Sequence, residues 1–151
     1  MTKEIIAFQG EKGAYSHLAC EETFPQAIIK TCSTFEETFK IASENENYKI
    51  MVPIENSLAG RVADIHYLLT KYKLQIYSEH FQNVEHNLLV KEGAELKDIK
   101  YVRSHAQAID QCQKLIIKHK FKTIISADTA GSAKELSLSN DRSIAAIASK
   151  L

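Results

Sequence analysis

Short apolar runs alternate with amphipathic segments along the chain, and this alternation limits the fold more than any other feature. In the first half, the apolar runs 4–9, 27–31 and 48–54 are each followed by residues with apolar side chains at helical spacing. A strand–helix–strand order of this kind predicts a parallel sheet whose strands are joined by helical crossovers. We therefore expect an α/β protein with parallel or mixed sheets and flanking helices.

The same alternation returns in the second half, after an extended segment at 74–81 that has no helical pattern. The later apolar runs are 84–90, 99–103, 122–126 and 143–148. A chain of 151 residues can form one domain or two small lobes that share a site. We expect a first lobe over residues 1–75 and a second lobe over residues 76–151.

The charge balance excludes two classes of partner. Lys and Arg together number 19 and Asp and Glu also number 19, so no net field attracts nucleic acid or an anionic membrane surface. A small anionic ligand needs only a local group of donors, so the charge balance does not exclude it.

Targeting and redox features indicate a cytoplasmic protein. No apolar run is long enough for a signal peptide or a bilayer span. The cysteines at 20, 32 and 112 are odd in number and far apart, which favours reduced, buried thiols. The six histidines form neither an HExxH motif nor an i, i+4 pair, so no metal is expected.

Two glycines bound the turn after the first apolar run. Gly10 and Gly13 allow a tight turn, and the helix that follows would offer free N–H groups to an anion. The alternative is a plain strand–helix turn in which Ser16 caps the helix. After the second apolar run, Ser33-Thr34-Phe35-Glu36 fits a capping box that opens the next helix.

The segment 51–61 joins an apolar run to three polar side chains in a row. Pro53 cannot donate to a sheet ladder, so the strand is expected to end there or to run along an edge of the sheet, and Glu55, Asn56 and Ser57 follow. Ligands of open α/β sheets bind at such strand ends. The alternative is a turn in which Asn56 or Ser57 caps the next helix.

Small polar residues follow most of the expected strands, and this repetition favours a binding site. If the sheets are parallel, these groups collect on their carboxyl edges, and two lobes would face each other across a cleft. The groups are Gly13/Ser16, Glu55/Asn56/Ser57, Ser104/His105/Gln107, Asp128/Thr129 and Ser149.

The motifs in their order resemble the catalytic domain of the prephenate dehydratase family. They are FQGEKGAYSH (8–17), VPIENS (52–57) with Gly60, EHNLL (85–89), SHAQA (104–108), DTA (128–130) and AAIAS (145–149). The resemblance implies two α/β lobes like those of a type II periplasmic binding protein. It also implies a carbon–oxygen lyase that converts prephenate to phenylpyruvate with loss of water and CO2 in phenylalanine biosynthesis. The resemblance implies no cofactor or metal. It does imply a homodimer.

The resemblance also implies which residues contact prephenate, a dianion suited to helix N-termini and neutral donors. Glu55 and His105 would support the site, and Gln111 would by default face solvent. The expected substrate-binding residues are Gly13, Ser16, Asn56, Ser57, Ser104, Gln107, Gln111 and Thr129.

Three departures from the family pattern affect this expectation. The family commonly has Thr or Ser where this chain has Ala14, and Pro where it has Ala106. The family's Thr-Arg-Phe motif, which carries its catalytic threonine, is not in this sequence. We therefore expect the second lobe to lack its C-terminal part and turnover to be weak or absent. The alternative function is a non-catalytic fragment of the same fold that binds small aromatic acids.

Overall fold

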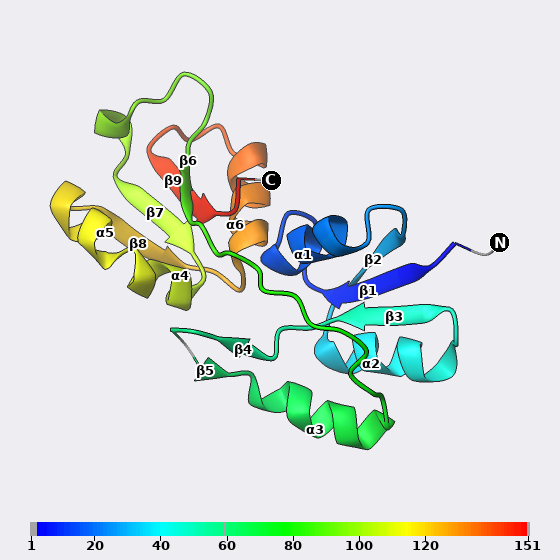
Figure 1. Cartoon of the computed structure of the whole chain (residues 1–151). Coiled ribbons are helices and arrows are strands. Elements are labelled where there is room, and N and C mark those ends of the chain that lie inside the picture. Colours follow the sequence, from blue (N-terminus) through cyan, green and yellow to red (C-terminus); the bar gives the residue numbers. More distant parts are fainter. Residues whose placement is uncertain (1–2, 59, 151) are drawn as a thin grey trace. The chain divides into compact units, whose positions relative to one another are not determined.

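The computed structural model describes residues 3–58 and 60–150 (Figure 1). Contacts between Cα atoms divide the chain into two compact units, Met1–Asn83 and Val84–Leu151. Residues 74–83 belong to the first unit, whereas the sequence pattern suggested a division after residue 75.

A three-stranded parallel sheet forms the centre of the first unit. Strand β1 (Ile5–Gln9) lies between β2 (Ile28–Cys32) and β3 (Tyr48–Met51), and both pairs are parallel. The three carboxyl ends therefore lie along one edge of the sheet. The parallel sheet predicted from the alternating pattern is confirmed here, although β3 ends at Met51 rather than at Ile54.

Helices cover both faces of this sheet (Figure 1). The helices are α1 (Tyr15–Thr23), α2 (Phe35–Glu44) and α3 (Ala63–Tyr72). Ile6 and Phe8 of β1 pack against Cys20 of α1. On the other face, Phe39 of α2 packs against Ile65 and Leu68 of α3. Neighbouring residues of β3 contribute to both cores, since Met51 packs on the first and Ile50 on the second, as a doubly covered sheet requires.

The cap of α2 lies one residue later than the sequence suggested. The Thr34 hydroxyl accepts from the backbone N–H of Glu37 at 3.1 Å, and the Glu37 carboxylate accepts from the backbone N–H of Ser33 at 2.7 Å. The predicted pairing of Ser33 with Glu36 is therefore wrong. Glu36 is instead turned toward α3, where its carboxylate accepts from Lys71 and Tyr72.

The second unit has a four-stranded mixed sheet. Its strands are β6 (Asn87–Leu89), β7 (Tyr101–Ser104), β8 (Lys122–Ile125) and β9 (Ile144–Ala148), in the order β6-β9-β7-β8. Strands β7, β8 and β9 are parallel, and β6 runs antiparallel to β9. The sheet is therefore mixed and not fully parallel, because the chain enters at its carboxyl edge.

Three α-helices and a short 3-10 turn complete the second unit. They are α4 (Ala106–Gln111), α5 (Gln113–His119), α6 (Thr129–Leu138) and η1 (Leu96–Asp98). The sequence suggested one helix after β7, but the structure has two that meet at Cys112. Val102 and Ile147 pack against Ile109 of α4, while Arg103, on the other face of β7, pairs with Glu135 of α6.

Within the described parts of the chain, no helix combines the length and the apolar character needed to cross a membrane. Among the same residues, no group of three or more His, Cys, Asp or Glu side chains is arranged to hold a metal ion.

Candidate functional site

The turn after β1 is held in a conformation that needs glycine. Gly10 and Gly13 have φ values of 126° and 89°, in the region that L side chains rarely adopt. The backbone N–H of Gly10 donates to the carbonyl of Cys32 at 3.0 Å, which ties the turn to the end of β2. The turn therefore lies at the carboxyl edge of the first sheet, where the sequence pattern predicted it.

Helix α1 starts without a side-chain cap. Its N-cap is Ala14, whose side chain makes no capping hydrogen bond. Ser16 lies inside the first turn and is half-buried, so the suggestion that Ser16 caps α1 is wrong. The first turn also carries no acidic residue. An uncapped helix N-terminus of this kind favours a bound anion.

His17 holds this turn, and the sequence reasoning did not single it out. The backbone N–H of Gly13 donates to His17 Nδ1 at 3.2 Å, and the His17 ring lies 5.5 Å from that of Phe8 between ring centroids. Only 8% of His17 is exposed. In the sequence, His17 follows Gly13 by four positions and falls in the first turn of the expected helix, and this spacing is the feature that could have indicated its contact with the turn.

The polar triplet after β3 lies in a small hairpin and not at a helix start. Strands β4 (Glu55–Asn56) and β5 (Gly60–Arg61) pair antiparallel, and α3 begins only at Ala63 with Val62 as N-cap. The suggestion that Asn56 or Ser57 caps a helix is therefore wrong. Asn56 Oδ1 accepts from the backbone N–H of Leu58 at 2.9 Å, while Glu55 and Ser57 are exposed.

Ser104, at the end of β7, is enclosed by the second sheet. Its side chain is fully buried, and its hydroxyl donates to the carbonyl of Ile147 at 2.6 Å. The hydroxyl expected to bind substrate therefore connects two strands in this structure. This geometry favours a scaffold role for Ser104.

His105 and Gln107 follow directly at the start of α4. His105 is the N-cap, and its Nδ1 accepts from the backbone N–H of Gln107 at 3.3 Å. The Gln107 side chain is half-buried. Gln107 and Gln111 are four residues apart, so they share one face of the helix.

Gln111 has a specific partner, His86. The distance from Gln111 Oε1 to His86 Nε2 is 2.7 Å, and Gln111 is half-buried rather than solvent-facing. The two residues are 25 positions apart, so no local pattern could have joined them.

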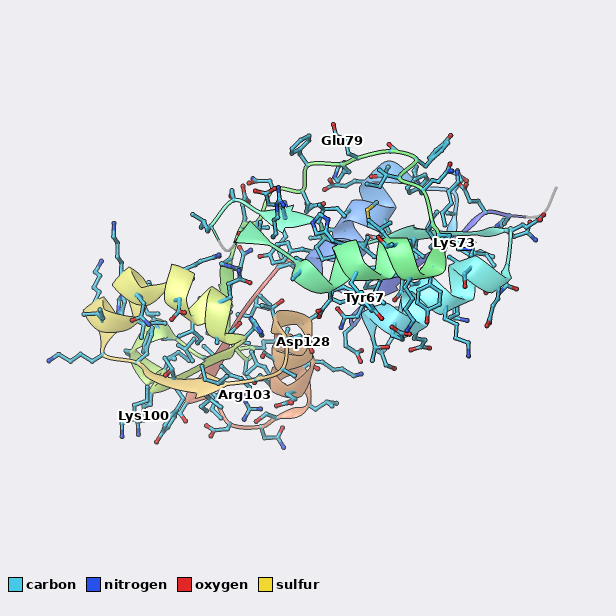
Figure 2. All side chains as sticks on the ribbon, turned by 90° about the horizontal axis from the view of Figure 1, so that it is seen from below. Tyr67, Lys73, Glu79, Lys100, Arg103 and Asp128 are labelled. Atoms are coloured by element: carbon cyan, nitrogen blue, oxygen red, sulfur yellow. The ribbon has the colours of Figure 1, made fainter. Side chains whose placement is uncertain are left out.

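Thr129 is the first residue of α6 and follows β8. The N-cap is Asp128, which is labelled in Figure 2. Its carboxylate accepts from the backbone N–H of Gly131 at 2.6 Å. Thr129 is half-buried beside this cap. Because β7, β8 and β9 are parallel, Thr129, Gln107 and Ser149 all follow strand ends at one edge of the second sheet.

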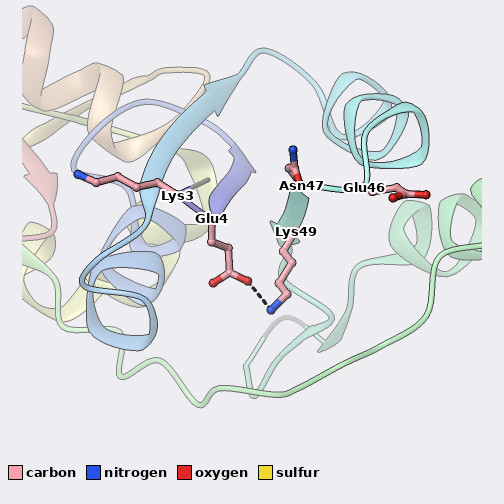
Figure 3. A pocket seen from close by; sticks show the side chains of 5 residues that line it. All are labelled: Lys3, Glu4, Glu46, Asn47 and Lys49. Carbon is pink, nitrogen blue, oxygen red and sulfur yellow. Dashed lines mark ion pairs between the residues drawn. The ribbon is translucent and has the colours of Figure 1, made fainter. Parts of the chain in front are cut away.

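A pocket of about 190 Å³ lies at the opposite, amino edge of the first sheet (Figure 3). Lys3 and Glu4 precede β1 there, Glu46 and Asn47 precede β3, and Lys49 of β3 pairs with Glu4. The hydrogen bond from Lys49 to Glu4 raises the pKa of Lys49. None of the expected site residues lines this pocket; in each unit they follow the carboxyl ends of that unit's own strands.

The fold and the edge groups together define an α/β protein of the type II periplasmic-binding-protein-like class. The family model described as prephenate dehydratase matches residues 6–151. The chain belongs to the prephenate dehydratase family.

Three similar proteins illustrate the relationship. A bifunctional N-acyl-homoserine lactone acylase/prephenate dehydratase of Komagataeibacter europaeus is 42% identical over 132 residues, which cover 87% of this chain and 47% of that protein. The arogenate dehydratase/prephenate dehydratase 2 of Arabidopsis thaliana is 34% identical over 145 residues, which cover 96% and 38%. The solved structure of prephenate dehydratase from Arthrobacter aurescens in complex with L-Phe has a TM-score of 0.87 at 28% identity, covering 97% and 50%. The chain thus spans half or less of the length of these relatives.

Proposed function

We propose that this chain carries the prephenate-binding part of a prephenate dehydratase. The observation that carries the proposal is the family match over residues 6–151, together with polar groups that follow the carboxyl ends of the strands in each unit. In the complete reaction prephenate would lose CO2 and water and become phenylpyruvate.

The first unit supplies suitable donors for a carboxylate. Helix α1 has a first turn without a side-chain cap or an acidic residue, directly after the Gly10–Gly13 turn. In this proposal the N–H groups of the first turn of α1 and the Ser16 hydroxyl bind one carboxylate, while the N–H groups of Gly10 and Gly13 are bonded to Cys32 and His17. Asn56 and Ser57 of the hairpin supply further neutral donors.

The second unit supplies the carboxamides of Gln107 and Gln111 and the hydroxyl of Thr129. Neutral donors suit a dianionic substrate that becomes a monoanion as CO2 and hydroxide depart, because a buried cluster of cations would hold the substrate as tightly as the transition state. Glu55, His105 and Ser104 have supporting roles in this proposal.

The chemistry itself needs mainly positioning and help for the leaving hydroxide. The ring becomes aromatic as CO2 and hydroxide depart, so holding the reactive conformer can supply several kcal/mol and a proton donor a few more. The 151 residues contain no Thr-Arg-Phe. The proposal is therefore that this chain binds prephenate and phenylpyruvate with weak turnover or none.

Asn56 offers a sharp test, because its two amide atoms have different tasks. Oδ1 accepts from Leu58 within the hairpin, and the NH2 group is the proposed ligand donor. The Asn56→Asp variant keeps the acceptor and replaces the donor with a negative charge. It should weaken phenylpyruvate binding by about tenfold or more with little change in stability.

Asn47→Asp is the matched control, since Asn47 precedes β3 at the amino edge of the first sheet, whereas Asn56 lies in the hairpin that follows the carboxyl end of β3. It makes the same change of charge and should leave phenylpyruvate binding within about twofold. Titration calorimetry on the wild type and both variants measures this. Equal binding by the two variants would remove Asn56 from the site, and no binding by the wild type would overturn the proposed function.

A second candidate function is the acylase activity named in the Komagataeibacter relative, which shares 42% identity over 87% of this chain. Incubation with an N-acyl-homoserine lactone would test it. Release of free fatty acid favours the acylase, whereas formation of phenylpyruvate from prephenate favours the dehydratase.

Arogenate, the substrate in the name of the Arabidopsis relative, should be tested beside prephenate in the dehydratase assay. Binding of prephenate without turnover would favour a plain binding module.

The remaining expectations concern assembly and location. We propose a homodimer in the cytoplasm, on the resemblance and on the absence of paired cysteines in the sequence. Light scattering after size-exclusion chromatography measures the mass in solution, and a monomer at micromolar concentration would contradict the dimer.

A further inference from the structure

The pairing of His86 with Gln111 carries an inference about how the site selects its ligand. His86 precedes β6, whose first residue, Asn87, lies opposite Ala148, the last residue of β9. Since β9 is parallel to β7 and β8, Ala148 is at the carboxyl edge of the sheet. The antiparallel direction of β6 therefore brings His86 to the same edge as Gln107 and Thr129.

The atoms in contact determine which end of the Gln111 carboxamide is used. Gln111 Oε1 is an acceptor, and it lies 2.7 Å from His86 Nε2. That contact requires a proton on Nε2, because two acceptors would repel each other. The carboxamide oxygen is then occupied by His86, and the end of Gln111 turned away from His86 is the NH2 group, which can only donate.

We propose that His86 is a positioning residue that fixes the Gln111 carboxamide with its NH2 group presented to the ligand. A glutamine that could rotate freely would offer a donor or an acceptor equally well. Fixed by His86, it offers donors alone, which suits a carboxylate and disfavours a ligand group that must itself donate. The inference deepens the proposed function and rests on it for the identity of the ligand.

The first test needs no ligand. Nitrogen-15 NMR of the free wild-type protein reports which ring nitrogen of His86 carries the proton, and also reports the side-chain amide of Gln111. We expect a protonated Nε2, and a Gln111 amide signal that moves in His86→Ala. A ring protonated on Nδ1 alone would overturn the proposal.

His119→Ala is the matched control. His119 is a half-buried histidine of the same unit, stacked on Phe121 with ring centroids 5.3 Å apart. It ends α5, before the amino end of β8, and so lies away from the carboxyl edge. Its replacement should leave the Gln111 amide signal unchanged, and a shift as large as that in His86→Ala would contradict a specific pairing.

Binding of phenylpyruvate provides the second test. His86→Ala should weaken binding by about tenfold, roughly the loss of one hydrogen bond to a charged group. His86→Gln can place an NH2 donor near the former Nε2 and should restore most of the affinity. In a Gln111→Ala background, His86→Ala should have no further effect, because its effect passes through Gln111.

Gln111→Glu separates the two ends of the side chain. The glutamate can still accept from His86, but it presents a carboxylate where the NH2 group was. We expect it to fold normally and to lose phenylpyruvate binding. If wild-type binding is normal and His86→Ala does not change it, the proposal fails. If the wild type binds neither phenylpyruvate nor prephenate, the proposed function fails and the NMR result alone decides the orientation of Gln111.

Discussion

The Ser104 hydroxyl donates a hydrogen bond of 2.6 Å to the carbonyl oxygen of Ile147, and both residues are almost fully buried. The bond joins β7 to β9 close to the edge that carries the candidate site. A buried side chain that bonds to a neighbouring strand has a structural task, which separates Ser104 from the polar residues that follow it.

Ser104→Ala should therefore reduce stability more than ligand binding. The change removes a buried hydrogen bond and leaves a carbonyl with one partner fewer, so we expect a loss of about 1–3 kcal/mol in the free energy of unfolding. Urea denaturation measures it. Ser137→Ala is the control, because the exposed Ser137 hydroxyl donates to the carbonyl of Lys134 in its own helix. A stable Ser104→Ala protein that no longer binds phenylpyruvate would place Ser104 in the ligand site instead.

The apolar runs allowed the sheets to be predicted from the sequence, because buried strands of an α/β sheet are apolar on both faces. Strand direction was harder to predict. The run that contains β6 looks like the others, and only its pairing with β9 reveals that it is antiparallel. The register of that pair is what brings His86 to the site.

Local polar patterns were ambiguous where two neighbouring residues could do the same task. Ser33 and Thr34 can both cap a helix, and Glu36 and Glu37 can both complete the box. Packing between α2 and α3 distinguishes the two glutamates, because the Glu36 carboxylate accepts a hydrogen bond from Lys71 of α3. In the same way, Asn56 could have capped a helix or closed a hairpin, and the hairpin strands were too short, at two residues each, to leave a periodic signal.

A cap can be added to α1 at Ala14. Ala14 has φ −67° and ψ 159°, the extended conformation of an N-cap, but it has no side-chain acceptor for the first turn. Ala14→Ser should raise the free energy of unfolding by about 1 kcal/mol. Thermal and urea unfolding measure the gain. Ala14→Val cannot cap and should not stabilise the protein, so an equal gain in both variants would contradict the capping explanation.

Ala106 is a site where proline should be tolerated. It is the first residue of α4, and the preceding His105 has φ −62° and ψ 145°, a conformation compatible with a following proline. Ala106→Pro should stabilise the protein by about 0.4–1 kcal/mol, because it restricts the unfolded chain. Asp110→Pro, at an exposed position beyond the first turn of the same helix, should instead cost about 3 kcal/mol or more. Destabilisation by Ala106→Pro would show that the backbone at the start of α4 differs from this structure.

The carboxylate of Glu36 should make stability depend on pH in the acid range. Hydrogen bonds from Lys71 and then Tyr72 lower the pKa of Glu36 below its ordinary value of 4.5. A lowered pKa means that the contribution is present above the unfolded-state value and is lost as the pH falls through the folded-state value. Wild type should therefore exceed Glu36→Gln in stability at pH 7, and the difference should shrink below about pH 4.

Urea unfolding of wild type and Glu36→Gln between pH 7 and pH 3 tests this dependence. Glu46→Gln is the control, an exposed glutamate of the same unit. Added salt should also reduce the Glu36 effect, since the pair with Lys71 is solvent-exposed. A stability difference for Glu36→Gln that stays constant from pH 7 to pH 3 would rule out the carboxylate as its source.

The three thiols should react in an order set by burial. Cys20 has no exposed surface, and burial, with a smaller effect of the nearby Glu21 charge, raises its pKa to about 12. Burial also raises the pKa of Cys32, which is 4% exposed, and of Cys112, which is half-buried where α4 meets α5. The thiolate is the reactive form, so a thiol that has a raised pKa and that the reagent cannot reach reacts slowest.

At pH 8 a disulfide reagent should modify Cys112 first and Cys20 only when the first unit opens. Peptide mass mapping at successive times, repeated in urea where all three should react together, measures the order. Modification of Cys20 as fast as Cys112 in the native protein would show that the core formed by Cys20, Ile6 and Phe8 opens far more readily than its packing implies.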